Sequence, residues 1–520
     1  MEFKINYAEL NKLNLADIGN TKFEGFIEKY MENFFENRIF SEFAKKEIYQ
    51  EAEDSLKIPM DDKTSIGHWS GEFWGKLMIS ACRVCKYTGG SELKDFIEKA
   101  ALKVISFARD DGYINSYKDS MNVFSPDPEK AFEIMGRDCD WNWNVRCRKY
   151  ALRGLIECAE LTGNDIILDA ANKLANQLID ELNVMSSVGF NDIFANASTL
   201  ENALSEPCDV IHWMRVCTEL FTLTGDVKYA DSVEKAFYNA FLAAVSDDGK
   251  WGARAVRSNC RNTLAEGQSG LKYNQCCLNN IPRGYINVVQ FALMKRQNGL
   301  YINMYCPLSG KVKTDNACVS VKISDGYIEN GKVSIIAETD NFVKVYLRKP
   351  DISGGNATLN GRKFTSSDGY FELNLEKGKT EINIDFDFKT EIHDFKYEVP
   401  RYDSEDFHIL RWIPYGKDSR IIPSKYMMQE RCAYLTYGPV LLSKSKKTGM
   451  TESEIFDFDT VLGKNFTASV QYKGSKDNFV MAEYDVCLEN ENSKFNLDMC
   501  TYATADDYNS EDDRFFNIYI

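Results

Sequence analysis

The stretch AELTGNDIILDAANKLANQLI, residues 159–179, decides the predicted fold because a closely similar pattern occurs at two other places in the chain. The counterparts are CKYTGGSELKDFIEKAALKVI, residues 85–105, and FTLTGDVKYADSVEKAFYNAF, residues 221–241. In each stretch a Thr-Gly pair separates segments whose apolar residues recur at the spacing of three and four that is typical of helices. Glycine can take the left-handed conformation that ends a helix, so each stretch predicts a helix, a short turn and a second helix.

The turns also contain side chains that can cap the second helix of each pair. Ser91, Asn164 or Asp165, and Asp226 can accept hydrogen bonds from the free N–H groups at a helix start. Helical pairs that repeat in this way need neighbours to cover their apolar faces, which predicts a toroid or solenoid of helix pairs. The alternative is a set of unrelated helix turns.

Beyond about residue 300 the pattern changes to short alternating runs. VSVKI, KVSIIA, VKVYLR, FELNL and EINIDFDF are typical of strands, and Asn-Gly and Asp-Gly pairs between them predict hairpin turns. The C-terminal DDRFFNIYI also alternates and is expected to complete a sheet. We therefore predict a helical domain over residues 1–300 and antiparallel β-sandwich material over residues 301–520.

The composition and net charge indicate a globular protein and argue against membrane-spanning and nucleic-acid-binding classes. The 520 residues are 44% hydrophobic and 27% charged, as in globular proteins, and no apolar run is long enough to predict a membrane span. The net charge of −16 would repel a phosphate backbone, so we expect no nucleic-acid partner. Residues 1–20 show no secretory signal pattern. The 15 cysteines are spread over the chain, and many lie within helical patterns where they resemble small buried side chains, which favours a reducing, cytoplasmic setting.

Two cysteine-containing segments could form a metal site. YNQCCLNNIPRGY contains the adjacent Cys276 and Cys277, and SEPCD contains Glu206 and Cys208. Three thiolates and one carboxylate suit tetrahedral Zn²⁺, and a zinc-bound thiolate is the nucleophilic form of cysteine. The alternative is that the adjacent cysteines are buried core residues. His212, one helical turn beyond Cys208, is expected to pack or to cap a helix, and an approach to the metal is the alternative.

Two further segments combine aromatic and polar side chains as sugar-binding sites do. They are GHWSGEFWGK, residues 67–76, and DCDWNWNVRCRKY, residues 138–150. Flat rings stack on the C–H faces of a sugar, and polar groups fix its hydroxyls. The predicted substrate-binding residues are His68, Glu72, Trp74, Asp140, Trp143 and Arg146. For each of them the alternative is core packing or helix capping.

The cysteine segments resemble those of a known family. The Glu-x-Cys of SEPCDVIHWMRV and the Cys-Cys-x-x-N-x-x-R of YNQCCLNNIPRG are similar to elements of glycoside hydrolase family 127, the β-L-arabinofuranosidases. Weaker likeness extends over GHWSGEFWGKLMISA, DDGYINSY, LNGRKF, SDGYFELNL and LTYGPVLL. This resemblance implies an (α/α)₆ barrel followed by β-sandwich material. It also implies a zinc ion held by Glu206, Cys208, Cys276 and Cys277, with Cys276 as the nucleophile of a retaining hydrolase.

The acid/base carboxylate is where the sequence departs from the family pattern. The family has a Gly-Glu before the zinc-binding Glu, whereas VMSSVGFNDIFANASTLENAL, residues 184–204, contains none. Asp192 and Glu201 are the candidate carboxylates there, and a solvated loop or a helix cap is the alternative for both. The second hypothesis is therefore a carbohydrate-binding or regulatory protein that keeps a structural zinc. A lyase or isomerase is a third, because a fold does not determine function.

Overall fold

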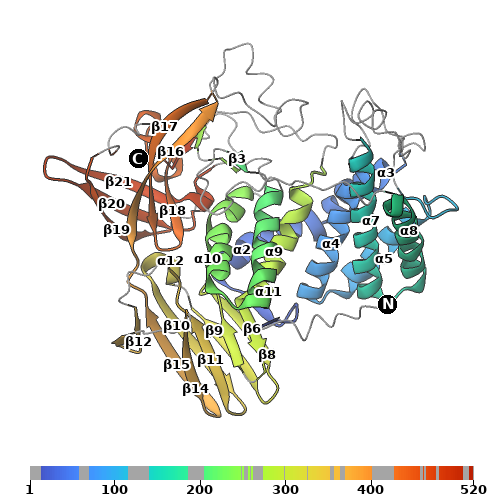
Figure 1. Ribbon diagram of the computed structural model, residues 1–520, viewed down its shortest axis with the longest axis horizontal. Helices are drawn as coiled ribbons and strands as arrows, with labels where there is room; N and C mark the ends of the chain where they lie inside the picture. Colours follow the sequence, from blue (N-terminus) through green and yellow to red (C-terminus); the bar gives the residue numbers. More distant parts are fainter. Residues whose placement is uncertain are drawn as a thin grey trace.

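The structure is a computed structural model in which helices and strands occupy different parts of the chain (Figure 1). It describes residues 13–57, 69–114, 140–184, 204–205, 207–246, 249–250, 256–257, 259–261, 273–297, 299–324, 326–351, 357–363, 369–400, 427–456, 461, 464–475, 480–506, 515–518 and 520. No helix among these residues is both long and apolar enough to cross a membrane.

The three predicted helical hairpins are confirmed. They are α4 with α5 (Ser70–Thr88, Ser91–Ile105), α7 with α8 (Asp140–Thr162, Asp165–Val184), and α9 with α10 (Pro207–Thr224, Val227–Ala236). Gly89, Gly163 and Gly225 have φ of 77°, 72° and 68°, as expected for glycines that end helices. The other helices are α2 (Gly25–Phe35), α3 (Gln50–Ser55), α11 (Ile281–Ala292), and the one-turn α12 (Tyr327–Asn330) and α14 (Glu452–Ile455).

The capping predictions are confirmed in part. Asn164 Oδ1 accepts a hydrogen bond from the backbone N–H of Ile166 at 2.9 Å, and Asp226 Oδ1 accepts one from Lys228 at 3.1 Å. Ser91 was expected to cap α5, and this was wrong. Gly90 takes the N-cap position and Ser91 is the first residue inside the helix. In all three hairpins the second helix starts two residues after the Thr-Gly glycine, so the residue at the N-cap position is Gly90 here and Asn164 or Asp226 in the other two.

Several helices contain wider or tighter turns that the hydrophobic pattern does not distinguish. The π-helical segments η1 (Glu36–Phe40) and η2 (Ala44–Tyr49) follow α2, and η4 (Phe237–Phe241) continues α10. Short 3₁₀ turns occur at η5 (Leu242–Ala244) and at η6 (Leu278–Asn280), which leads into α11. The helical part is thus less regular than an ideal array of hairpins.

The helices that carry the cysteine segments lie side by side. α4 packs on α7 and on α11, and α11 packs on α9. Within the described ranges three hairpins are complete, fewer than the six of an (α/α)₆ barrel. The structure therefore confirms a layer of paired helices joined to β-sheets, and the six-hairpin closure stays a prediction.

Glycines allow α4 and α7 to pack unusually closely. A Cβ added to Gly75 would lie 2.2 Å from the backbone oxygen of Tyr150, and one added to Gly154 would lie 3.2 Å from the Cα of Gly75. We expect Gly75→Ala to lower the free energy of unfolding by about 3 kcal/mol, since the helices must separate to admit a methyl group. Denaturant unfolding measures this effect.

Gly90→Ala is the matched control for this prediction. A Cβ at Gly90 would meet its nearest atom at 3.9 Å, and its φ of −79° suits alanine. Its expected cost is under about 1 kcal/mol. Equal stabilities of the two variants would show that the close contact of α4 and α7 is not needed.

Two sheets lie beneath the helices in Figure 1, and the third lies beside them. The orders are β1-β6-β7-β11-β14, then β13-β12-β15-β10-β9-β8-β2, and then β16-β17-β18-β21-β20-β19 with β22 paired to β18 and β5. β3 and β4 form a separate pair. The bounds are β1 Asn14–Leu15, β2 Thr21–Phe23, β3 Leu204–Ser205, β4 Val256–Arg257, β5 Asn259–Arg261, β6 Leu293–Arg296, β7 Gly299–Ile302, β8 Leu308–Lys313, β9 Cys318–Ile323, β10 Lys332–Thr339, β11 Val343–Arg348, β12 Thr358–Leu359, β13 Arg362–Lys363, β14 Tyr370–Leu375, β15 Gly378–Asp385, β16 Thr390–Pro400, β17 Met427–Tyr437, β18 Val440–Ser445, β19 Thr467–Gly474, β20 Glu483–Glu489, β21 Lys494–Thr501 and β22 Phe515–Asn517.

The predicted strands are present, and burial alternates along them, as in β9, where Val319, Val321 and Ile323 are buried. The pairing is antiparallel except between β7 and β11, which run parallel, with Val345 opposite Leu300. The C-terminal strand β22 joins a sheet, as predicted. The predicted boundary at residue 300 falls inside β7, and the N-terminal β1 and β2 also join these sheets.

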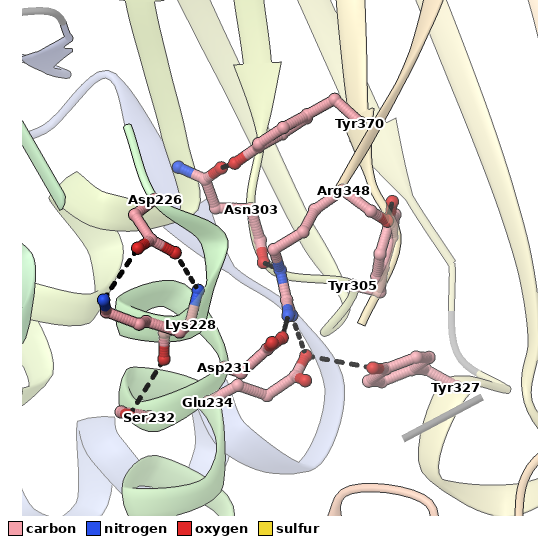
Figure 2. A network of polar contacts seen from close by, with 10 residues as sticks. All are labelled: Asp226, Lys228, Asp231, Ser232, Glu234, Asn303, Tyr305, Tyr327, Arg348 and Tyr370. Atoms are coloured by element: carbon pink, nitrogen blue, oxygen red, sulfur yellow. Dashed lines mark hydrogen bonds and ion pairs between the residues drawn. The ribbon is translucent and has the colours of Figure 1, made fainter. Parts of the chain in front are cut away.

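A buried ionic cluster connects the helices to the sheets (Figure 2). Arg348, at the end of β11, forms ion pairs with Asp231 and Glu234 of α10, and its distance to Glu234 is 2.5 Å. Its Nε donates to the backbone oxygen of Asn303 at 2.7 Å, and the Tyr327 hydroxyl donates to Glu234 at 3.0 Å. Arg348 and Glu234 are almost completely buried. The carboxylates outweigh the desolvation of the guanidinium and keep the pKa of Arg348 above its usual range.

Candidate metal centre

Cys208 lies in the first turn of α9. Pro207 starts the helix, a position that suits proline because the first N–H groups of a helix have no partner within it. Cys208 is buried. The positive end of the helix dipole favours a thiolate at this position.

The two adjacent cysteines lie at the opposite side of the same site, in the turn that leads into η6 and α11. The Sγ atoms of Cys276 and Cys277 are 3.6 Å apart. Cys277 is fully buried, whereas Cys276 is partly exposed. Among these three cysteines, Cys276 is thus the one whose residue is not classed as buried.

Asparagine side chains hold this turn in place. Asn279 Nδ2 donates to the backbone oxygen of Phe73 on α4 at 3.0 Å and to Asn274 Oδ1 at 2.8 Å. Asn274 Nδ2 donates to Glu51 at 2.8 Å, and Arg38 donates to Asn279 Oδ1 at 3.1 Å. Because these bonds are mostly buried and tie the turn to α3, α4 and η1, they hold in place the backbone that carries the two cysteines.

The ligand atoms of Cys208, Cys276 and Cys277 lie within 4.8 Å of one another. Sulfurs bound to one tetrahedral zinc ion at about 2.3 Å would be about 3.8 Å apart, so the three thiols have the spacing and the chemistry that zinc requires. The predicted fourth ligand, Glu206, lies outside the described residues. The structure thus confirms that the two cysteine segments meet, and it brings together three of the four predicted ligands.

Basic side chains lie near the thiols. Contacts with Cys276 and Cys277, aided by the charge of Lys76, lower the pKa of Cys208 well below its usual range despite burial. Contact with Cys208 raises the pKa of Cys276 and that of Cys277 well above the usual range. Of the three thiols, that of Cys208 thus has its pKa shifted toward the charged form.

Lys76 is the nearest of these positive groups. Its Nζ donates a hydrogen bond to Cys208 Sγ at 3.5 Å and forms an ion pair with Glu72 at 2.6 Å. Burial opposes the charge, but Cys208 and Glu72 outweigh it and raise the pKa of Lys76 well above its usual value. Sequence reasoning missed Lys76, although the spacing of four between Glu72 and Lys76 on one helix was visible.

His212 and Arg283 complete this environment. Burial, together with Arg283, lowers the pKa of His212 to about 3, so the imidazole is neutral at pH 7. His212 is close enough to Cys208 to affect it electrostatically but does not belong to the three-residue thiol cluster. Burial also lowers the pKa of Arg283 to about 9.

Unsatisfied polar atoms gather in the Cys-Cys-x-x-N-x-x-R segment. Asn280 Nδ2 and Oδ1, Gln275 Oε1, and Arg283 Nε and Nη2 are buried and have no hydrogen-bond partner among the residues that the structure describes. Buried polar groups are nearly always satisfied, by protein, water or ligand. These atoms can therefore bind water or the hydroxyls of a bound molecule. The sequence motif contains Asn280 and Arg283, but the structure was needed to show that their polar atoms are free to bind a ligand.

Of the six predicted sugar-binding residues, the structure describes the side chains of two, Glu72 and Trp74. Glu72 is buried in its ion pair with Lys76, and Trp74 is fully buried in the hydrophobic core. In the described structure both have packing or pairing roles, and their contact with sugar stays a prediction. The backbone of α7 places Asp140, Trp143 and Arg146 on its first two turns, and their side chains lie outside the described part. The other predicted residues, His68, Asp192 and Glu201, also lie outside the described residues.

Comparison with known proteins supports the resemblance seen in the sequence. Residues 151–287 match the family described as beta-L-arabinofuranosidase, GH127 catalytic domain. Over this segment the chain is similar to glycoside hydrolase family 127. The matched segment contains Cys208, Cys276 and Cys277, so the family likeness covers the thiol cluster.

One curated relative of family 127 is a non-reducing end beta-L-arabinofuranosidase from Bifidobacterium longum subsp. longum. It is 23% identical over 265 residues, which are 46% of this chain and 40% of the relative. The match thus spans less than half of that enzyme's length.

Solved structures described as family 127 enzymes have the same fold. One, a beta-arabinofuranosidase, aligns with a TM-score of 0.67 at 12% identity and covers 99% of this chain and 98% of its own. A beta-L-arabinofuranosidase from Geobacillus stearothermophilus T6 aligns with a TM-score of 0.57 at 12% identity, with 98% and 99% covered. The helical and β parts of the chain therefore follow the family fold together.

Proposed function

We propose that the protein is a zinc- and cysteine-dependent retaining glycoside hydrolase that acts on β-L-arabinofuranosides or related short oligosaccharides. The observation that carries the proposal is the convergence of Cys208, Cys276 and Cys277 inside the segment related to family 127. The sugar is inferred from the arabinofuranosidase activity of the similar proteins.

The proposed metal ligands are Cys208, Cys276, Cys277 and Glu206. When bound, zinc would keep the sulfurs deprotonated at neutral pH and so maintain a nucleophilic thiolate. Such ligation requires reduced cysteines, which supports a reducing, cytoplasmic location.

In the proposed first step the Cys276 sulfur attacks the anomeric carbon. A C–S bond forms as the bond to the leaving oxygen breaks, and a carboxylic acid, Asp192 or Glu201, gives its proton to that oxygen. In the second step the resulting carboxylate takes a proton from water. The water oxygen bonds to the anomeric carbon as the C–S bond breaks, and two inversions give net retention.

The chain's other groups would support these steps from around the cluster. Asn280 and Arg283 offer buried donors and an acceptor for sugar hydroxyls. Cys276 is partly exposed and is therefore the sulfur proposed to face the sugar, whereas Cys208 and Cys277 are buried. In this proposal Cys276 is both a metal ligand and the reactive sulfur, whereas Cys208 and Cys277 serve as metal ligands alone.

We expect the purified protein to contain about one zinc ion per chain and to lose most of it in Cys208→Ala, since one of four ligands is removed. Elemental analysis by mass spectrometry measures this content.

A screen of aryl glycosides should find hydrolysis of the β-L-arabinofuranoside, with retained configuration in the product. A protein without zinc, or a zinc protein active on other glycosides alone, would contradict the proposal.

The second candidate is a carbohydrate-binding or regulatory protein with a structural zinc on the same fold. It is favoured by the absence of Gly-Glu from residues 184–204. A zinc-loaded protein that binds arabinose-containing oligosaccharides in calorimetry but hydrolyses no aryl glycoside would establish this alternative.

A further inference from the structure

Lys76 brings a full positive charge to the thiol cluster from the buried side of α4. Its ammonium is 3.5 Å from Cys208 Sγ, 2.6 Å from a carboxylate oxygen of Glu72, and 4.7 Å from the centre of the Tyr150 ring. Both charged side chains are at most 1% exposed. Such a buried charge is costly unless several partners satisfy it.

The three partners give the ammonium a definite direction. Glu72, one helical turn earlier, occupies one donor, and the face of Tyr150 accepts a cation–π contact. A further donor is directed to the sulfur of Cys208. Within the described contacts, Glu72 acts as the anchor that holds Lys76 in this orientation.

The charge of the proposed metal centre explains why such a cation is useful there. Three thiolates and a carboxylate carry more negative charge than Zn²⁺ neutralises, and the cysteines at this site are mostly buried. A hydrogen bond from a neighbouring group to a ligand atom orients the ligand and stabilises the charged form. Lys76 supplies that hydrogen bond to Cys208 and not to the partly exposed Cys276.

We propose that Lys76, oriented by Glu72, is a positioning residue that fixes the Cys208 sulfur as a metal ligand and compensates the excess negative charge of the centre. This inference rests on the proposed function, because it assumes a zinc ion at the thiol cluster. It assigns Glu72 a role in the metal centre, where the sequence had predicted contact with substrate.

The proposal is tested by measuring the zinc affinity of two variants. Lys76→Met removes the charge at similar side-chain length, and Lys76→Arg keeps it. Competition with a chromophoric chelator gives the zinc dissociation constant of each purified protein. We expect Lys76→Met to weaken zinc binding about 10- to 100-fold, and Lys76→Arg to recover most of the loss. The matched control is Lys86→Met on the same helix, whose ammonium pairs with Glu157 and Glu160 and should leave zinc affinity unchanged.

Thermal unfolding of the zinc-free proteins separates positioning from folding. If Lys76→Met fails to fold, Glu72→Gln takes its place, and we expect an approximately tenfold loss of zinc affinity because Lys76 loses its anchor. Folded Lys76→Met or Glu72→Gln with wild-type zinc affinity would overturn the role of Lys76 while leaving the proposed function intact. A wild-type protein that binds no zinc would overturn both.

Discussion

Replacing Cys276 by alanine is expected to lower hydrolysis of an aryl β-L-arabinofuranoside by at least about 10³-fold. The variant lacks the sulfur that would form the covalent intermediate, and removal of a catalytic nucleophile commonly costs several orders of magnitude in kcat. Because Cys276 is also a predicted zinc ligand, its zinc content should fall as well. Initial rates at saturating substrate, with zinc content measured on the same sample, give both effects.

A second cysteine variant shows whether the loss is specific. Cys487 is partly exposed, like Cys276, but lies on β20, away from the thiol cluster. Cys487→Ala should keep wild-type activity and zinc content. If Cys276→Ala retained more than about a tenth of wild-type activity, the sulfur of Cys276 could not be the nucleophile.

Replacing Arg348 by methionine should be among the most destabilising single changes in the chain. Arg348→Met would leave Glu234 and Asp231 buried without their cation, at the junction of α10 and β11 (Figure 2). Loss of one partner from a buried ion pair costs about 3–5 kcal/mol because the remaining charge is uncompensated. The midpoint of chemical denaturation, followed by fluorescence, measures this loss.

The control lies on the same strand. Lys344 forms a surface pair with Glu372 at 2.6 Å, and both side chains are 44% exposed. Lys344→Met should cost less than about 1 kcal/mol because solvent screens the pair. Adding Asp231→Asn and Glu234→Gln to Arg348→Met should restore part of the stability. Equal midpoints for Arg348→Met and Lys344→Met would contradict the importance of the buried cluster.

Patterns within short stretches of the sequence predicted much of the fold. The Thr-Gly turns predicted all three complete hairpins, since left-handed glycine at a helix end depends on neighbouring residues alone. Strand alternation predicted β9, β10, β11, β14 and β15 for the same reason. The pairing of β7 with β11 and the entry of β1 and β2 into the sheets depend on contacts between distant residues, which periodicity does not contain.

The candidate site, too, was predicted from the sequence only in part. Cys208, Cys276 and Cys277 were predicted from residue type and from family likeness, and the structure brings them together. Lys76 was missed because its significance depends on a contact with Cys208 on another helix. Glu72 was predicted to bind substrate because it lies among aromatic residues, but its nearest described partner is Lys76. Residue types thus predicted the ligands, and the helix packing was needed to find the group that supports them.

Peptide mapping of the protein during turnover tests the central claim most directly. The enzyme would be mixed with an activated β-L-arabinofuranoside, quenched in acid within the first turnovers, digested, and analysed by mass spectrometry. The account predicts a pentosyl group attached to Cys276, absent from Cys208 and Cys277, which disappears when substrate is exhausted. Hydrolysis with the pentosyl group on another residue, or an adduct on Cys208 in place of Cys276, would contradict it.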